Sequence, residues 1–370
     1  MIMKYKKKIL SVLLAAAALT GYAQDSDHIA ISDFTLDAGV EQTEDVIETQ
    51  TAQVILYNQK DYGGMQFYLT LPDGVSIYDN EGLWYDLESR LKYKVGRVDT
   101  PFNVRIEKQE DGSYIFVIFN TDNKTIGGNS GDPILTIYLV VSDPEAYKTG
   151  TKQCTITDLR LAAIGGNPED GTKLGNFTSD CTLRVKAKTG KGGYGSFSWP
   201  HALDFTNAGV EAYVAEKDEN CIVSLNRVYN VPANTGVIIK GDASTEYYPE
   251  TTDDGGTATS ILTATTDASY TVASDNIYAL ATKNGKTAFY KVNKGVDVPL
   301  YKAYLTHEAT TEAGAEEFLG YDFTTTGIEV VENSAIDSTD DTYHTIDGVR
   351  VKQPAKRGIY IHNGNKVVVK

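Results

Sequence analysis

The stretch from residue 53 to residue 77 restricts the fold more than any other, because apolar and polar side chains alternate along it. In residues 65–71 every second position is apolar, beginning at Met65. A period of two puts one face of a strand into a core and leaves the other face outward. The polar segment before these residues ends in Gly63-Gly64, which is a turn signal. The stretch therefore predicts two β-strands joined by a turn.

Segments of the same kind fill residues 28–187, and no long segment has the 3.6-residue period of an amphipathic helix. We therefore expect an all-β protein whose first domain is a two-sheet β-sandwich. Residues 114–119 are apolar throughout, which predicts a central strand that is covered on both faces. The expected strands of this domain are residues 29–36, 51–57, 65–71, 75–78, 102–107, 114–119, 133–141, 154–162 and 179–185.

The charge balance restricts the partners. The chain has 50 acidic and 34 basic residues, and its formal net charge is −16. Nucleic acid requires a basic footprint for its phosphates, and anionic lipid attracts cations, so neither is a predicted partner. The simplest interpretation of the charge is solubility.

Residues 1–23 have the features of a signal peptide. Four lysines between Lys4 and Lys8 precede an apolar run over residues 9–19, which is too short for an ordinary membrane span. Gly21-Tyr22-Ala23 then offers a cleavage site with small residues. We expect the mature protein to be secreted or on the outer cell surface, without a transmembrane segment. The alternative is a buried N-terminal helix.

Residues 28–187 resemble the cohesin and carbohydrate-binding-module type of sandwich. The resemblance rests on residues 65–77 with their Leu-Pro-Asp-Gly turn, on residues 114–121, and on the Gly-rich loop and long apolar strand of residues 126–141. It implies a binding function: a dockerin partner for cohesins, or a glycan for the modules. No dockerin-type calcium loop occurs elsewhere in this sequence.

Two cysteines fall in the last two expected strands of the sandwich. Because an exported protein meets an oxidising compartment, we expect a disulfide between Cys154 and Cys181. The alternative is a pair of buried free thiols. Cys221 belongs to the next domain, where we expect a buried strand residue.

Residues 188–195 are rich in lysine and glycine and predict a linker before a second β-rich domain over residues 196–323. This domain resembles one that recurs in exported proteins of Bacteroidetes-type bacteria. The resemblance lies in Gly193, Tyr194 and Phe197, in the Val-Pro-Ala-x-Thr-Gly turn of residues 231–236, and in the Lys-Ala-Tyr-Leu strand of residues 302–305. It implies no particular activity. The expected strands are residues 197–199, 212–215, 222–228, 236–240, 277–282, 288–292 and 302–305.

Residues 324–342 predict a second linker, and residues 343–370 a short β-hairpin tail with turns at Asp347-Gly348 and Asn363-Gly364. The tail is similar to the C-terminal sorting domain of type IX secretion, although it is shorter. This resemblance implies that the secretion machinery is a partner. The alternative is a hairpin packed on the second domain. The matching residues are Gly348, Val351, Pro354, Gly358, Tyr360, Lys366 and Lys370.

Catalytic and metal-binding patterns are missing from the sequence. The five histidines are scattered without zinc-ligand spacing, and neither a P-loop nor a Gly-x-Ser-x-Gly motif occurs. We therefore expect no catalytic residues, no metal site and no cofactor. A calcium ion in the loops at Asp79-Asn80-Glu81 or Asp122-Asn123 stays open as an alternative.

One aromatic cluster suggests a ligand. Tyr78, Trp84 and Tyr85 fall in or beside a polar loop, and exposed rings of this kind stack on sugars. The alternative is that Trp84 closes the end of the sandwich. We therefore expect a non-enzymatic exported protein that binds a glycan or an extracellular protein. A structural or adhesive surface component is the second hypothesis, and a polysaccharide-acting enzyme is the third.

Overall fold

The computed structural model describes residues 27–79, 102–127, 133–219, 221–307 and 317–323, together with five further strands. The chain divides into two compact units, Met1–Thr324 and Thr325–Lys370. In the described residues, helix is confined to α1 (Glu44–Ile47) and the 3-10 turn η1 (Pro168–Asp170). The all-β prediction is confirmed. No helix in the described residues is long and apolar enough to cross a membrane.

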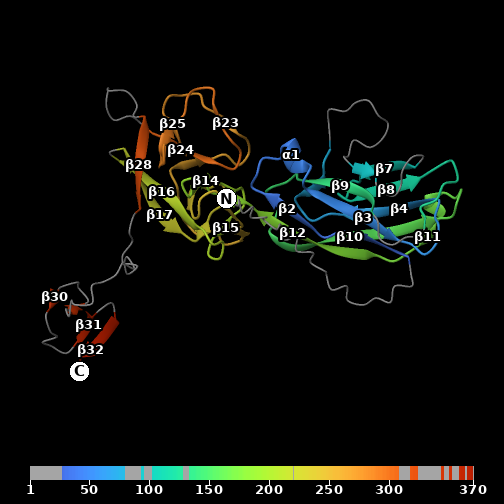
Figure 1. Ribbon diagram of the computed structural model, residues 1–370, viewed down its shortest axis with the longest axis horizontal. Helices are drawn as coiled ribbons and strands as arrows, with labels where there is room; N and C mark the ends of the chain where they lie inside the picture. Colours follow the sequence, from blue (N-terminus) through green and yellow to red (C-terminus); the bar gives the residue numbers. More distant parts are fainter. Residues whose placement is uncertain are drawn as a thin grey trace, which may run out of the picture. The chain divides into compact units, whose positions relative to one another are not determined.

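The N-terminal part of the first unit is a sandwich of two sheets (Figure 1). The smaller sheet has the order β1 (His28–Ile31), β3 (Thr51–Tyr57), β9 (Pro133–Val141) and β5 (Val75–Ile77), and β6 (Tyr93–Val95) also pairs with β9. The larger sheet has the order β2 (Phe34–Ala38), β12 (Phe177–Val185), β10 (Gly150–Ala162), β4 (Gly64–Thr70), β8 (Tyr114–Phe119) and β7 (Asn103–Lys108).

The alternating pattern of the sequence forms the core between these sheets. Met65, Phe67 and Leu69 of β4 are completely buried. Phe67 stacks on Phe116 of β8 with ring centroids 4.5 Å apart. The expected strands 51–57, 114–119 and 133–141 are confirmed with the same bounds.

Two details of the sandwich differ from the prediction. The expected strand 29–36 is divided, because the chain leaves the smaller sheet after β1 and enters the larger sheet as β2. The strand 114–119 is not central: β8 lies next to the edge strand β7, and only alternate residues are fully buried. Its outward residues are apolar and half-buried, so this face of the larger sheet is partly apolar.

A second β-domain follows within the same unit. Its nine-stranded sheet has the order β14 (Tyr194–Phe197), β19 (Val237–Lys240), β16 (Glu211–Glu219), β17 (Ile222–Val228), β28 (Phe318–Phe323), β25 (Lys286–Lys291), β24 (Ile277–Lys283), β27 (Ala303–Thr306) and β22 (Leu262–Ala264). The strand β28 was not expected from the sequence.

The chain at the start of the expected linker is hydrogen-bonded to both domains. Lys186 donates its backbone N–H to Ala38 O at 2.8 Å, and β13 (Ala187–Lys188) pairs with β20 (Glu246–Tyr247). Ala187 and the side chain of Thr189 are buried. Because lysines alternate with small buried residues, the basic composition concealed a strand.

The C-terminal unit is a four-stranded sheet of its own. Its order is β30 (Arg350–Val351), β29 (Tyr343–Thr345), β31 (Gly358–His362) and β32 (Asn365–Val369). Gly358 and Tyr360 lie on β31, and Val351 lies on β30. Lys366 lies on β32. The remaining sorting-like positions Gly348, Pro354 and Lys370 lie outside the described residues, as do residues 1–26 and the expected linker 324–342.

Candidate functional site

The predicted aromatic platform lies largely outside the described residues, because Trp84 and Tyr85 fall there. Tyr78, which follows β5, is half-buried and donates its backbone N–H to Tyr138 O at 2.8 Å. This hydrogen bond continues the pairing of β5 with β9. The role of the platform in binding stays a prediction.

The expected disulfide is absent. Cys154 of β10 and Cys181 of β12 lie on adjacent antiparallel strands, but both are buried free thiols. The register explains the difference: Cys154 faces Ser179, and Cys181 faces Lys152. The two cysteines are therefore diagonal neighbours rather than a facing pair. A hydrogen bond to Cys181, together with burial, raises the pKa of the Cys154 thiol.

Of the two loops that could hold calcium, the one at Asp122-Asn123 is organised by the side-chain amide of Asn120. The Asn120 side-chain oxygen accepts the backbone N–H of Asp122 at 3.1 Å and that of Lys124 at 2.9 Å. Of the other loop, only Asp79 is described. Within the described ranges, no three His, Cys, Asp or Glu side chains lie close enough together to hold a metal ion.

The outward face of the larger sheet carries an apolar surface. Ile115 and Val117 of β8 and Tyr68 of β4 form it, and we call these three residues the outer-sheet surface. All three are half-buried. On β7 they are flanked by the exposed ion pair between Arg105 and Glu107, at 3.2 Å.

A protein segment already covers the neighbouring part of this face. The turn η1 contacts β4, β8 and β10, and Pro168 is buried there. A Cβ at Gly64 would lie 3.0 Å from Pro168 Cγ. The absence of a side chain at this position of β4 therefore lets the turn pack closely on the strand. Arg160, Asp158 and Lys173 form charged contacts beside it, at 3.1 and 2.6 Å.

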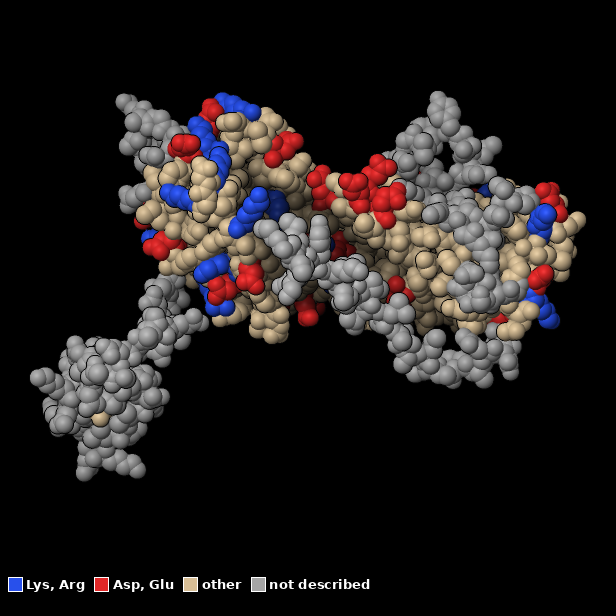
Figure 2. Space-filling model, in the orientation of Figure 1, with Lys and Arg blue, Asp and Glu red and all other residues tan. Residues whose placement is uncertain are grey.

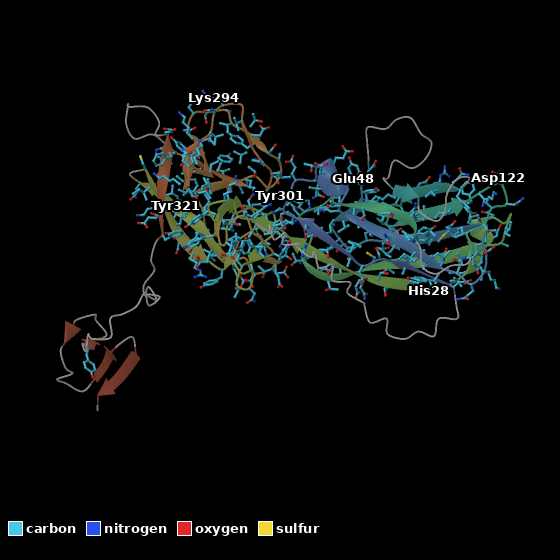
Figure 3. The ribbon with its side chains drawn as sticks, viewed as in Figure 1. His28, Glu48, Asp122, Lys294, Tyr301 and Tyr321 are labelled. Carbon is cyan, nitrogen blue, oxygen red and sulfur yellow. The ribbon has the colours of Figure 1, made fainter. Side chains whose placement is uncertain are left out.

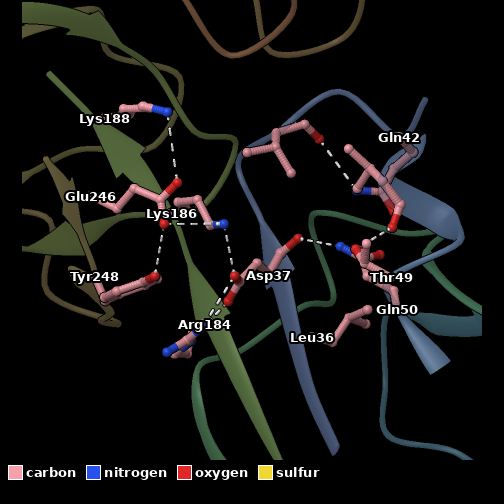
Figure 4. Close-up of polar contacts among 12 residues, drawn as sticks. Leu36, Asp37, Gln42, Thr49, Gln50, Arg184, Lys186, Lys188, Glu246 and Tyr248 are labelled. Atoms are coloured by element: carbon pink, nitrogen blue, oxygen red, sulfur yellow. Dashed lines mark hydrogen bonds and ion pairs between the residues drawn. The ribbon is translucent and has the colours of Figure 1, made fainter. Parts of the chain in front are cut away.

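Charged groups connect the sandwich to the second β-domain (Figure 4). Asp37 accepts two hydrogen bonds from Arg184, at 2.7 and 3.1 Å, and lies 3.0 Å from Lys186 Nζ. Lys186 also reaches Glu246 of the second domain at 3.4 Å. The Arg184 guanidinium lies over the ring of Tyr248, 4.0 Å from its centroid. The lysine is only 20% exposed, so the contacts are partly shielded from solvent.

Aromatic rings extend this junction into the second β-domain. Tyr147 of the sandwich meets Trp199 edge-on, with ring centroids 6.2 Å apart, and Trp199 packs on Tyr301 at 4.9 Å. The Tyr147 hydroxyl donates to Leu36 O at 2.6 Å. Burial raises the pKa of Tyr147 above its usual value, so the hydroxyl stays protonated. One apolar core runs through both domains at this point.

The motif residues of the second domain meet around Trp199. Asn234, in the turn of residues 231–236, donates its backbone N–H to Trp199 O at 3.0 Å. A Cβ at Gly236 would lie 2.7 Å from the Cβ of Ala303. The Ser198 hydroxyl donates to Lys302 O at 2.7 Å. These contacts therefore hold the second β-domain together beside the packed rings of Trp199 and Tyr301.

No family model matches the chain, and no curated protein sequence matches it. Similar solved structures are cohesin modules. One is a non-cellulosomal cohesin from the hyperthermophilic archaeon Archaeoglobus fulgidus, with 11% sequence identity and a TM-score of 0.30, covering 42% of this chain and 90% of that chain.

Two further similar structures come from bacteria. The cohesin module of a family 33 glycoside hydrolase from Clostridium perfringens has 12% identity and a TM-score of 0.28, covering 43% of this chain and 96% of that one. The seventh ScaB type I cohesin from Pseudobacteroides cellulosolvens has 15% identity and a TM-score of 0.27, covering 44% and 94%.

Proposed function

We propose that this chain is an exported, non-enzymatic binding protein whose sandwich recognises an extracellular protein. The observation that carries the proposal is the outer-sheet surface of Tyr68, Ile115 and Val117. A solvated face of an antiparallel sheet ordinarily alternates to polar residues, and β8 does not. A partner that covers these side chains would remove them from water, which is favourable.

The surroundings of the outer-sheet surface favour a folded protein as the partner. Charged side chains of both signs stand on both sides of it, in β7 and around Asp158. An apolar centre with a polar rim is the usual anatomy of a protein interface. A sugar would instead call for a platform of several aromatic rings, whereas Tyr68 is one ring beside two aliphatic side chains. An anionic membrane would call for an excess of cations, whereas the face drawn in Figure 2 carries acidic as well as basic side chains. The turn η1 shows that polypeptide packs on this face.

Site-specific crosslinking on the surface of the producing cells tests this function. A photoreactive phenylalanine analogue replaces Val117, and in a control chain it replaces Thr178, an exposed residue of β12 in the same sheet. We expect a discrete adduct from position 117 that protease removes, that Ile115→Lys abolishes, and that is missing from position 178. A thermal melt must show that Ile115→Lys leaves the sandwich folded.

Two outcomes would contradict the proposal. Equal adducts from both positions would mean that the crosslinking is not specific to the outer-sheet surface. An adduct that resists protease but is removed by glycosidases would identify a glycan as the ligand and return attention to Trp84.

A further inference from the structure

A cleft in the second β-domain has the properties of a ligand site. Its volume is about 640 Å³, within the range that holds small molecules. It lies between β14, β24 and the start of β27, with the segment 292–299 along one side. Leu280, Val292 and Val298 supply apolar walls. Thr282 and Thr287 hydrogen-bond to each other at 2.8 Å at the cleft, where Gly192 packs against both hydroxyls.

The most buried of the three lysines that line the cleft, Lys302, has no acidic partner among the described residues. Lys302 lines the cleft and is half-buried. Among the described residues no carboxylate lies within ion-pair distance of it, whereas the nearby Lys188 reaches Glu246 at 3.8 Å. Burial lowers the pKa of Lys302, and the positive charge of Lys188 lowers it further. An ammonium group that is taken from water without a counter-charge is unfavourable, so the site is incomplete electrostatically.

The backbone holds Lys302 in this position at some conformational cost. The preceding residue is Tyr301, whose place in the second β-domain is labelled in Figure 3. Its φ is 61°, a left-handed conformation that few residues other than glycine adopt. Thr265 braces the pair: its carbonyl accepts from Tyr301 N at 2.7 Å, and its hydroxyl accepts from Lys302 N at 2.9 Å. Strain that the surroundings maintain in this way is common at binding sites.

We propose that this cleft binds a small organic carboxylate with an apolar body, which is a function separate from the sandwich surface. The ammonium group of Lys302 donates to the carboxylate, and Leu280 and Val298 cover the body.

Lys188 and Lys191 also line the cleft. Glu246, which pairs with Lys188, and the cleft residue Asp297 offset two of the three positive charges. The net single charge suits a monoanion, whereas a phosphate calls for a fork of arginine donors or a backbone nest.

Calorimetric titration with matched ligands tests the cleft. The probes are aliphatic and aromatic carboxylates of about six to twelve carbons, each compared with its neutral amide. We expect at least one carboxylate to bind more tightly than about 1 mM, and its amide about tenfold or more weakly, since a hydrogen bond to a charged group has that magnitude.

The variants locate the binding. Lys302→Met keeps the aliphatic stem, and it should weaken carboxylate binding about tenfold or more while leaving amide binding unchanged. Lys217→Met is the control, because Lys217 is exposed on β16 and pairs with Glu219 at 3.6 Å. It should leave the affinity unchanged.

Three results would overturn the proposal: no probe binds, acid and amide bind equally, or Lys302→Met binds the acid as tightly as the native protein does. If Lys302→Met does not fold, the comparison of acid with amide on the native protein still decides. None of these results depends on the outer-sheet surface, so the two proposals fail separately.

Discussion

Replacing Asp37 with asparagine should loosen the junction between the sandwich and the second β-domain. The change keeps the shape of the side chain but removes the charge that faces Arg184 and Lys186. Burial lowers the pKa of Lys186, but the hydrogen bond and charge of Asp37, together with the charges of Glu246 and Tyr248, outweigh burial and raise the pKa. Without that charge, two partly buried cations remain close together, and among the described residues Glu246 is the carboxylate still paired with Lys186.

The magnitude follows from how far these groups are shielded. Asp37 is 16% exposed and Lys186 is 20% exposed, between a surface pair and a buried one. Exposed pairs contribute up to about 1 kcal/mol, and breaking a buried pair costs about 3–5 kcal/mol. We therefore expect Asp37→Asn to lower the free energy of unfolding by about 2 kcal/mol, or the melting temperature by about 4 °C.

Thermal and denaturant unfolding of the full chain measure this effect. Lys148→Met is the matched control, since Lys148 pairs with Asp253 at the same junction at 3.0 Å, but the two side chains are 51% and 88% exposed. The control should leave the melting temperature unchanged. An Asp37→Asn melting temperature within about 1 °C of the native value, at low and at high salt, would refute the reasoning.

Two further predictions concern stability. Gly236→Ala should destabilise by about 1–3 kcal/mol in denaturant unfolding, because the new methyl group would lie 2.7 Å from Ala303 Cβ, whereas Gly175→Ala, with no described atom within 4 Å, should be neutral. Burial, aided by Asp27, raises the pKa of Tyr62 to about 12. The contribution of this protonated hydroxyl to the free energy of unfolding is therefore complete below about pH 10 and is lost as the pH rises to about 12. Stability measured between about pH 9 and pH 12 should therefore fall less steeply in Tyr62→Phe than in the native protein, and equal slopes would contradict the assignment.

The sequence pattern predicted strands well where alternation was strong and uninterrupted. Residues 114–119 and 133–141 are examples, because their register toward a core is readable from every second side chain. It failed where pairing partners decide the structure. The strand Phe318–Phe323 has a buried residue only at Leu319 and is ordered by β17 and β25 on either side.

The candidate sites were harder to predict. Adjacency of Cys154 and Cys181 was foreseeable from strand order, but their diagonal offset depends on register. The cleft brings together segments that are about a hundred residues apart, and Lys302 and Leu280 both line it where β24 and β27 are neighbours in the sheet. The sequence signal was the lysine that opens an otherwise apolar strand. The left-handed conformation of Tyr301 had no signal at all.

The strands β2 and β12, which are the first and the last strands of the larger sheet along the chain, pair in parallel, and this has a mechanical consequence. Phe34 pairs with Cys181 and Ala38 pairs with Val185, so β2 and β12 run in the same direction. A tension that enters ahead of β2 and leaves beyond Val185 would slide these strands past each other. Their hydrogen bonds would then bear the force together rather than open one after another. The sandwich is thus constructed to transmit a pulling load to the second β-domain without unravelling from its end.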